Sequence, residues 1–204
     1  EIRTPMNGVM GMTHLLLETE LDGEQRNLVE VISNSSRALL NLINDTLDFS
    51  KLEAGRLELE TIDFDLRCTV DEVGALLAPM ADAKQLKFDC RVSHEVPSRL
   101  QGDPGRLRQI LFNLGGNAIK FTESGAVSIR VDRLEEDDAQ VRMKFTVHDT
   151  GIGITGEQMG RLFQNFSQAD ASIARQFGGS GLGLAISRQL VQLMNGQVGV
   201  ESTP

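Results

Sequence analysis

The feature that most constrains the fold is a seven-residue repeat of apolar side chains over the first 54 residues. In residues 1–20, and again from the following turn to about Ala54, apolar or small side chains recur at alternating steps of three and four. The positions are Ile2, Met6, Val9, Thr13 and Leu16 in the first stretch, and Leu28, Ile32, Ser35, Leu39, Leu42, Thr46 and Phe49 in the second. This spacing predicts two helices joined by the turn Leu21-Asp22-Gly23, with Gly55 as a natural end of the second helix.

A hairpin of two such helices cannot bury both apolar seams by itself. Two hairpins from two copies of the chain would bury them in a four-helix bundle, so we expect a homodimer. The alternative is that the seams pack against the rest of the same chain.

From Leu57 onward, short strands alternate with helices. The pattern predicts an extended segment at 57–66, strands at 86–92, 127–131 and 141–147, helices at 70–80, 104–121 and 155–163, a helix ending near Met194, and a last, truncated strand from Val198. The acidic residues 135–138 are expected to form a turn. The predicted fold class is α+β, with an antiparallel helical hairpin at 1–55 followed by an α/β sandwich with a mixed sheet at 56–204.

Composition excludes some functions. The formal net charge of -9 argues against a broad nucleic-acid-binding face. No apolar run has the length of a membrane span, so no direct membrane contact is expected from this segment. Cys68 and Cys90 lack zinc-ligand spacing and are interpreted as reduced thiols.

Three polar residues mark the helix predicted at 104–121. Asn113, Asn117 and Lys120 fall within one narrow stripe, away from the apolar face. Amide oxygens and an ammonium on the same side suit a magnesium ion and phosphates. A solvated helix face is the alternative for the asparagine pair taken alone.

Two glycine clusters follow. Asp149, Gly151 and Gly153 come directly after a predicted strand, where flexible backbone would admit a flat ring and the carboxylate could accept from an exocyclic amine. The alternative is a strand-ending turn with an Asp cap. The second cluster, 178–183, opens a helix with Ser180 near its start, an arrangement that favours anions. The two Phe residues between the clusters, Phe163 and Phe166, would either pin the loop or fill the core.

The order of these motifs resembles the sensor histidine kinases, most closely hybrid kinases of the GacS/BarA type. The N, G1, F and G2 boxes of that family match Asn113…Asn117, Asp149-x-Gly151-x-Gly153, Phe163-x-x-Phe166 and Gly179-x-Gly181-x-Gly183. Glu1 to Gly8 looks like the H box, beginning one position after the phosphoacceptor histidine, and Leu47 to Gly55 resembles the end of the second dimerisation helix. The resemblance covers essentially the whole chain.

The resemblance implies a dimerisation and phosphotransfer hairpin followed by an ATP-binding domain of the GHKL superfamily. It implies that Asn117, with Asn113, coordinates Mg²⁺, that Lys120 meets the phosphates, and that Asp149 recognises adenine. Residues implied to surround the rest of the nucleotide are Phe121 near the base, Arg175 in an ATP lid at 164–180, and Ser180, Gly181, Leu182 and Gly183 along the phosphate chain.

The implied reaction moves the γ-phosphoryl group of ATP to a histidine and then to an aspartate of a response-regulator receiver domain. Glu1 would hydrogen-bond the acceptor histidine, and Thr4 would orient water for dephosphorylating the regulator; first-turn helix capping is the alternative for both. The segment would be the cytoplasmic portion of a membrane-anchored sensor kinase.

Two departures from the family pattern leave other functions open. The acceptor histidine is not in the sequence, because His14, His94 and His148 stand elsewhere. Gly115, next to Gly116, replaces an apolar residue and is expected to loosen the helix that carries the asparagines. The alternatives are a GHKL ATPase of the chaperone or topoisomerase kind, and a non-catalytic dimeric module with weakened nucleotide binding.

Overall fold

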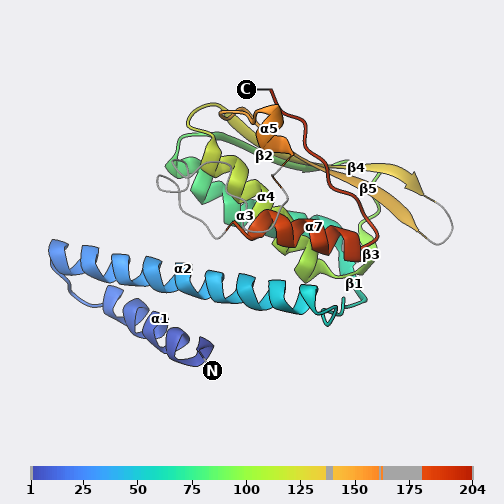
Figure 1. Cartoon of the computed structure of the whole chain (residues 1–204). Helices are drawn as coiled ribbons and strands as arrows, with labels where there is room; N and C mark the ends of the chain where they lie inside the picture. The colour runs from blue at the N-terminus through green and yellow to red at the C-terminus, as the bar shows by residue number, and fades with distance from the viewer. Residues whose placement is uncertain (1, 137–139, 161, 163–180, 204) are drawn as a thin grey trace. The chain divides into compact units, whose positions relative to one another are not determined.

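The structure, a computed structural model, describes residues 2–136, 140–160, 162 and 181–203. The chain separates into two compact units, Glu1–Leu57 and Glu58–Pro204. The first is helical and the second combines helices with a mixed sheet (Figure 1). The α+β fold class predicted from the sequence is therefore confirmed.

The helical unit is a hairpin of α1 (Arg3–Leu17) and α2 (Gly23–Glu53), which pack against each other. A capping box starts α2: the Gln25 backbone N–H donates to Asp22 Oδ1 at 2.8 Å, and the Asp22 N–H donates to Gln25 Oε1 at 3.2 Å. Gly55, with φ of +62°, ends α2 in the left-handed region, as its position predicts.

The hairpin buries little of its apolar surface. Thr13, Val29, Ser36 and Leu40 are its buried helical residues among those described. The large apolar residues that stay exposed are Ile2 just before α1, Val9, Met12, Leu15 and Leu16 on α1, and Leu28, Val31, Ile32, Leu39, Leu42 and Leu47 on α2.

The sheet of the second unit has the order β2 (Lys87–Val92), β4 (Ala126–Glu136), β5 (Val141–Asp149). Strands β2 and β4 run parallel, and β4 and β5 antiparallel. A separate antiparallel pair joins β1 (Ile62–Asp65) to β3 (Arg99–Gly102).

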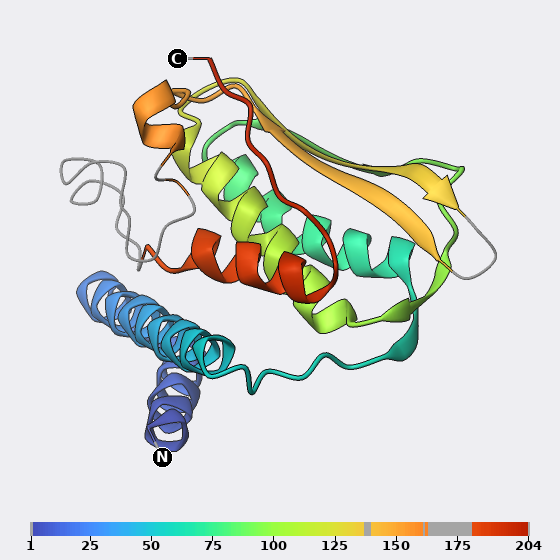
Figure 2. The same ribbon diagram turned by 45° about the vertical axis from the view of Figure 1, so that its right-hand side comes forward.

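One face of the sheet is covered by a helical layer of α3 (Leu66–Ala83), α4 (Pro104–Phe121) and α7 (Gly183–Leu193), as Figure 2 shows. The short helix α5 (Gly156–Met159) follows β5. The core lies between the layers, with Leu66, Val70, Val73, Leu77, Leu111, Ile119, Val127, Ile129 and Val131 almost completely buried.

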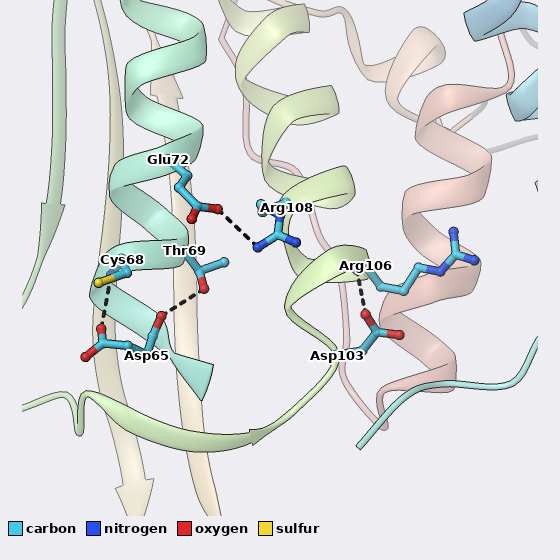
Figure 3. Close-up of polar contacts among 7 residues, drawn as sticks. All are labelled: Asp65, Cys68, Thr69, Glu72, Asp103, Arg106 and Arg108. Atoms are coloured by element: carbon cyan, nitrogen blue, oxygen red, sulfur yellow. Dashed lines mark hydrogen bonds and ion pairs between the residues drawn. The ribbon is translucent and has the colours of Figure 1, made fainter. Parts of the chain in front are cut away.

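Carboxylates begin the two longer helices of this layer (Figure 3). Asp65 Oδ1 accepts from the Cys68 backbone N–H at 3.0 Å at the start of α3. Asp103 Oδ1 accepts from the Arg106 N–H at 2.9 Å at the start of α4, where Pro104 fits the first turn because it needs no donor. An ion pair of 3.1 Å between Arg108 and Glu72 joins the two helices.

Several predicted boundaries are wrong. The extended segment 57–66 is a strand only at 62–65, because the Asp65 cap starts α3 at Leu66. Glu135 pairs with Arg142 inside the β4–β5 ladder instead of forming a turn. No strand forms at 198–200 within the described residues 181–203; that segment returns to the loop after β5, where the Ile154 N–H donates to Ser202 Oγ at 2.9 Å.

Two further differences concern short elements. The helix predicted at 155–163 spans only Gly156–Met159 among the described residues, and β3 was not predicted. No helix in the described part of the chain combines the length and apolarity needed to cross a membrane.

Candidate functional site

Helix α4 carries the polar stripe formed by Asn113, Asn117 and Lys120. Its buried face packs Leu107, Ile110, Leu111, Ala118 and Ile119 into the core. Asn113, Asn117, Lys120 and Phe121 are half-buried on the same helix. The helix thus holds both amides and the ammonium on one rigid element.

Gly115 does not interrupt α4, which runs unbroken from Pro104 to Phe121. A Cβ on this buried glycine would lie 2.5 Å from Leu77 Cδ1 and 3.3 Å from Ile129 Cδ1. The missing side chain lets α3 and the sheet approach α4 closely, so the glycine serves packing. The helix is therefore continuous at the position where the sequence suggests a weakness, and the glycine has a packing role there.

The end of α4 lies against the loop that follows β5. The Ile152 backbone N–H donates to the Phe121 carbonyl at 3.3 Å. A Cβ on Gly151 would lie 2.5 Å from that same oxygen and 2.8 Å from Asp149 Oδ1. Only glycine fits this approach, which brings Lys120 and Phe121 next to the Asp149–Gly153 segment.

The Asp149 carboxylate is exposed and held in place from its own loop. Its Oδ1 accepts from the Gly151 backbone N–H at 2.9 Å. Gly153, two residues on, has φ of +68°, in the left-handed region that glycine adopts readily. The carboxylate is therefore presented at a defined position beside a glycine-rich turn.

Thr150 fixes the same loop from the other side. The Ala126 N–H donates to Thr150 Oγ1 at 3.0 Å, and the Thr150 N–H donates to the Ala126 carbonyl at 3.1 Å. Gly125 has φ of +117°, and a Cβ there would overlap the Thr150 hydroxyl. Sequence reasoning missed Thr150; the glycine in the Ser124-Gly125 turn was the available signal.

Lys84, which the sequence did not indicate as a site residue either, hydrogen-bonds to the carboxyl end of α4. Its Nζ donates to the carbonyl oxygens of Ile119, Lys120 and Thr122 at 2.9, 2.7 and 3.2 Å. These are carbonyls that a helix end leaves without partners inside the helix, and a cation is favoured there. Lys84 is some 35 residues away from these carbonyls in the sequence, so no local sequence pattern indicates the contact.

The start of α7 faces Asn113. Gly181, with φ of +68°, and buried Leu182 lead into Gly183, the first residue of the helix. A Cβ on Gly183 would overlap Asn113 Oδ1, and Asn113 Nδ2 donates to Ser187 Oγ at 2.8 Å. The first asparagine of the stripe is thus packed against the second glycine cluster.

The Lys120 ammonium is partly removed from water. Burial lowers the pKa of the Lys120 ammonium, which lies 4.9 Å from the centroid of the Phe121 ring. A phosphate nearby would favour the charged form and counter that shift.

Among the described residues, no three His, Cys, Asp or Glu side chains gather where they could hold a metal. A divalent cation at this site would therefore use amide oxygens together with ligand oxygens, the hard donors that Mg²⁺ prefers.

The structure therefore brings together Asn113, Asn117, Lys120, Phe121, Asp149, Gly151, Gly153, Gly181, Leu182 and Gly183, through α4, the loop after β5 and the start of α7. The predicted residues Glu1, Phe163, Phe166, Arg175, Gly179 and Ser180 lie outside the described residues. Thr4 is exposed in the first turn of α1, in the other unit. A depression of about 520 Å³ beside β1 and β3 contains none of the predicted residues.

Two protein families match the chain. Residues 102–204 match the family described as histidine kinase-, DNA gyrase B-, and HSP90-like ATPase, and residues 1–55 match the His Kinase A (phospho-acceptor) domain.

Known proteins agree with these families. The chain is 48% identical over 204 residues to the sensor histidine kinase GacS of Pseudomonas protegens and 50% identical to the signal transduction histidine-protein kinase BarA of Escherichia coli; the match covers the whole chain but only 22% of either relative. The solved structure of full-length ShkA in complex with AMPPNP is similar over 98% of this chain and 42% of ShkA, with a TM-score of 0.74 and 38% identity.

Proposed function

The chain belongs to the histidine kinase-, DNA gyrase B- and HSP90-like ATPase family, with a His Kinase A segment ahead of that domain, and on this premise we propose that it is the core of an ATP-dependent protein-histidine kinase. The observation that carries the proposal is the convergence of the asparagine stripe of α4, the loop after Asp149 and the start of α7. A GHKL ATPase of another class would have no use for the phospho-acceptor segment that precedes the domain.

We assign the nucleotide contacts as follows. Asp149 accepts from the adenine amine, and the Gly151 and Gly153 backbone lets the ring approach. Lys120 and the backbone amides of Gly181, Leu182 and Gly183 bind phosphate oxygens, because ammonium groups and the N–H groups at a helix start are natural anion donors. Asn113 and Asn117 hold Mg²⁺, which when bound would neutralise charge on the phosphates.

For Thr4 and for the residues outside the described ranges, the assignments rest on the family resemblance. Arg175 would reach the γ-phosphate, Gly179 and Ser180 would bind the phosphate chain, and Phe163 and Phe166 would hold the intervening loop in place. Glu1 would hydrogen-bond one nitrogen of the acceptor histidine, for which the resemblance assigns the position before Glu1, and raise the nucleophilicity of the other. Thr4 would orient water for dephosphorylation of the regulator.

Two partners and a location complete the proposal. The exposed apolar side chains of the hairpin would pair with a second copy, forming a homodimer. A receiver domain of a response regulator would accept the phosphoryl group on an aspartate. The segment would act on the cytoplasmic side, as part of a sensor kinase anchored in the membrane.

Labelled ATP tests the reaction. A protein that carries the H-box histidine ahead of Glu1, incubated with γ-labelled Mg-ATP, should gain an acid-labile, alkali-stable phosphoryl group. Absence of label on an intact dimer would reject the kinase assignment. Rapid steady-state phosphate release without protein labelling would favour the ATPase alternative.

Nucleotide selectivity tests the Asp149 assignment. Asp149→Asn keeps an oxygen that can accept from the Gly151 N–H but adds a donor toward the base. The variant should lose about tenfold or more in ADP affinity, which corresponds to one missing charge-assisted hydrogen bond, and bind GDP no worse than before. Equal losses for both bases would mean that Asp149 does not read the base.

A further inference from the structure

The contact between Asn113 and Ser187 joins two helices that are 74 residues apart in sequence. Ser187 lies in α7 among the buried residues Ala185, Ile186 and Leu190, and only 2% of it is exposed. A hydroxyl so deeply buried needs a hydrogen-bond partner. The Asn113 side chain supplies one, with 2.8 Å between Nδ2 and Oγ.

The two ends of the Asn113 amide are chemically different. Oδ1 is a hard ligand for a divalent cation, whereas Nδ2 can only donate. The Ser187 oxygen accepts from Nδ2, and the whole carboxamide lies against Gly183, where an added Cβ would overlap Oδ1 and lie 2.9 Å from Nδ2. A carboxamide has a soft terminal torsion, so its orientation depends on contacts such as this hydrogen bond.

We propose that Ser187 is a positioning residue for the divalent cation that accompanies the nucleotide. Its hydroxyl accepts from Nδ2 of Asn113 and so restrains the carboxamide, with Oδ1 outside that hydrogen bond as the atom offered to the cation. The proposal rests on the proposed function, in which Asn113 and Asn117 hold Mg²⁺. Partners of this kind, which orient a metal ligand without touching the metal, typically contribute 10- to 100-fold in metal affinity.

A comparison of Ser187→Val with Ser187→Thr separates the effect of the hydroxyl from the effect of side-chain size, because Val and Thr have nearly the same shape. ADP affinity is measured by calorimetry for both variants, once with Mg²⁺ and once with EDTA. Ser187→Val should weaken ADP binding about tenfold or more with Mg²⁺ and leave the affinity in EDTA within twofold of the wild type. Ser187→Thr, which keeps the hydroxyl, should restore most of the Mg²⁺-dependent gain.

A third variant guards against strain from the added methyl group. Ser187→Ala removes the hydroxyl without adding bulk and should show the same selective loss in Mg²⁺. Equal losses with Mg²⁺ and with EDTA would show a merely structural role and overturn the proposal, as would identical behaviour of the Val and Thr variants.

If the proposed function itself is incorrect, the same experiment gives a different result. In that case the wild-type protein itself would bind ADP no more tightly with Mg²⁺ than with EDTA. Loss of the magnesium effect in Ser187→Val alone, with a normal magnesium effect in the wild type, is the outcome that assigns the role to the hydroxyl.

Discussion

The hairpin and the α/β unit differ in how far their large apolar side chains are buried. On α2, Leu28 and Ile32 are 56% and 48% exposed, whereas Leu111 and Ile129 in the second unit are completely buried. Helices α3 and α4 of the α/β unit pack their apolar faces against the sheet, whereas within its own unit the hairpin offers each helix just one neighbouring helix among the described residues. The difference shows that a regular apolar repeat specifies helices well and yet leaves them incomplete without a partner.

The largest expected effect comes from placing a charge in the exposed seam of the hairpin. Ile32→Asp should weaken dimerisation more than about 100-fold, because a carboxylate would be buried without a partner in the proposed bundle. Sedimentation measures the oligomeric state, and calorimetry with Mg-ADP should show nucleotide affinity unchanged within twofold.

Asn34→Asp is the matched control, since Asn34 is exposed on the side of α2 opposite Ile32. It should dimerise like the wild type. A wild-type chain that stays monomeric at high concentration would mean that its own second unit covers the seam, and the contrast between the two units would disappear.

The next effect belongs to the α/β unit alone. Gly151→Ala places a methyl group 2.5 Å from the Phe121 carbonyl oxygen, so the loop after β5 must move away from α4. Affinity for Mg-ADP should fall about tenfold or more, a loss of roughly 1.4 kcal/mol, while dimerisation stays intact.

Gly156→Ala provides the comparison, because no atom lies within 4 Å of the Cβ that it adds a few residues away. Its nucleotide affinity should match that of the wild type. Similar losses in both variants would show that the close approach of Gly151 has no special part in binding.

Local patterns explain what the sequence could predict. The α2 repeat, the glycine that ends it, and the Asp103-Pro104 start of α4 each consist of neighbouring residues with a fixed geometric role. The glycine clusters and asparagines were found for the same reason. In contrast, β3 has one large apolar residue in four, Leu100, and is recognisable only beside its partner β1.

The contacts that the sequence could not predict are those that hold the site together. Lys84 reaches the end of α4, Ser187 reaches Asn113, and Gly115 receives Leu77, all across separate elements. Gly115 is the clearest example. Helix propensity alone predicts that this glycine destabilises α4, whereas its contact with Leu77 of α3 gives it a role in packing.

Lys84 tests how much one such contact stabilises the α/β unit. Lys84→Met keeps the length of the side chain but removes the ammonium from three carbonyl oxygens. The free energy of unfolding should fall by about 2 kcal/mol, as expected for hydrogen bonds to a charged group. Chemical denaturation measures the loss in the transition of the α/β unit.

Lys87→Met serves as the control, because Lys87 is exposed on β2 and close in sequence. It should change the stability by less than about 0.5 kcal/mol. Equal effects of the two substitutions would mean that the ammonium of Lys84 contributes no more than a surface charge.

The smallest effects come from two adjacent glycines of α4, and their opposite signs are informative. Gly116→Ala adds a methyl group with no atom within 4 Å, so it should stabilise the unit by about 1 kcal/mol through helix propensity. Gly115→Ala gains the same propensity but drives its methyl group against Leu77, which is completely buried. Overpacking of a core costs about 1–3 kcal/mol, so this variant should lose stability overall. If both variants gained stability equally in chemical denaturation, Gly115 would be an ordinary helix weakness after all, and the tight packing that distinguishes the α/β unit from the hairpin would not extend to the helix that carries the site.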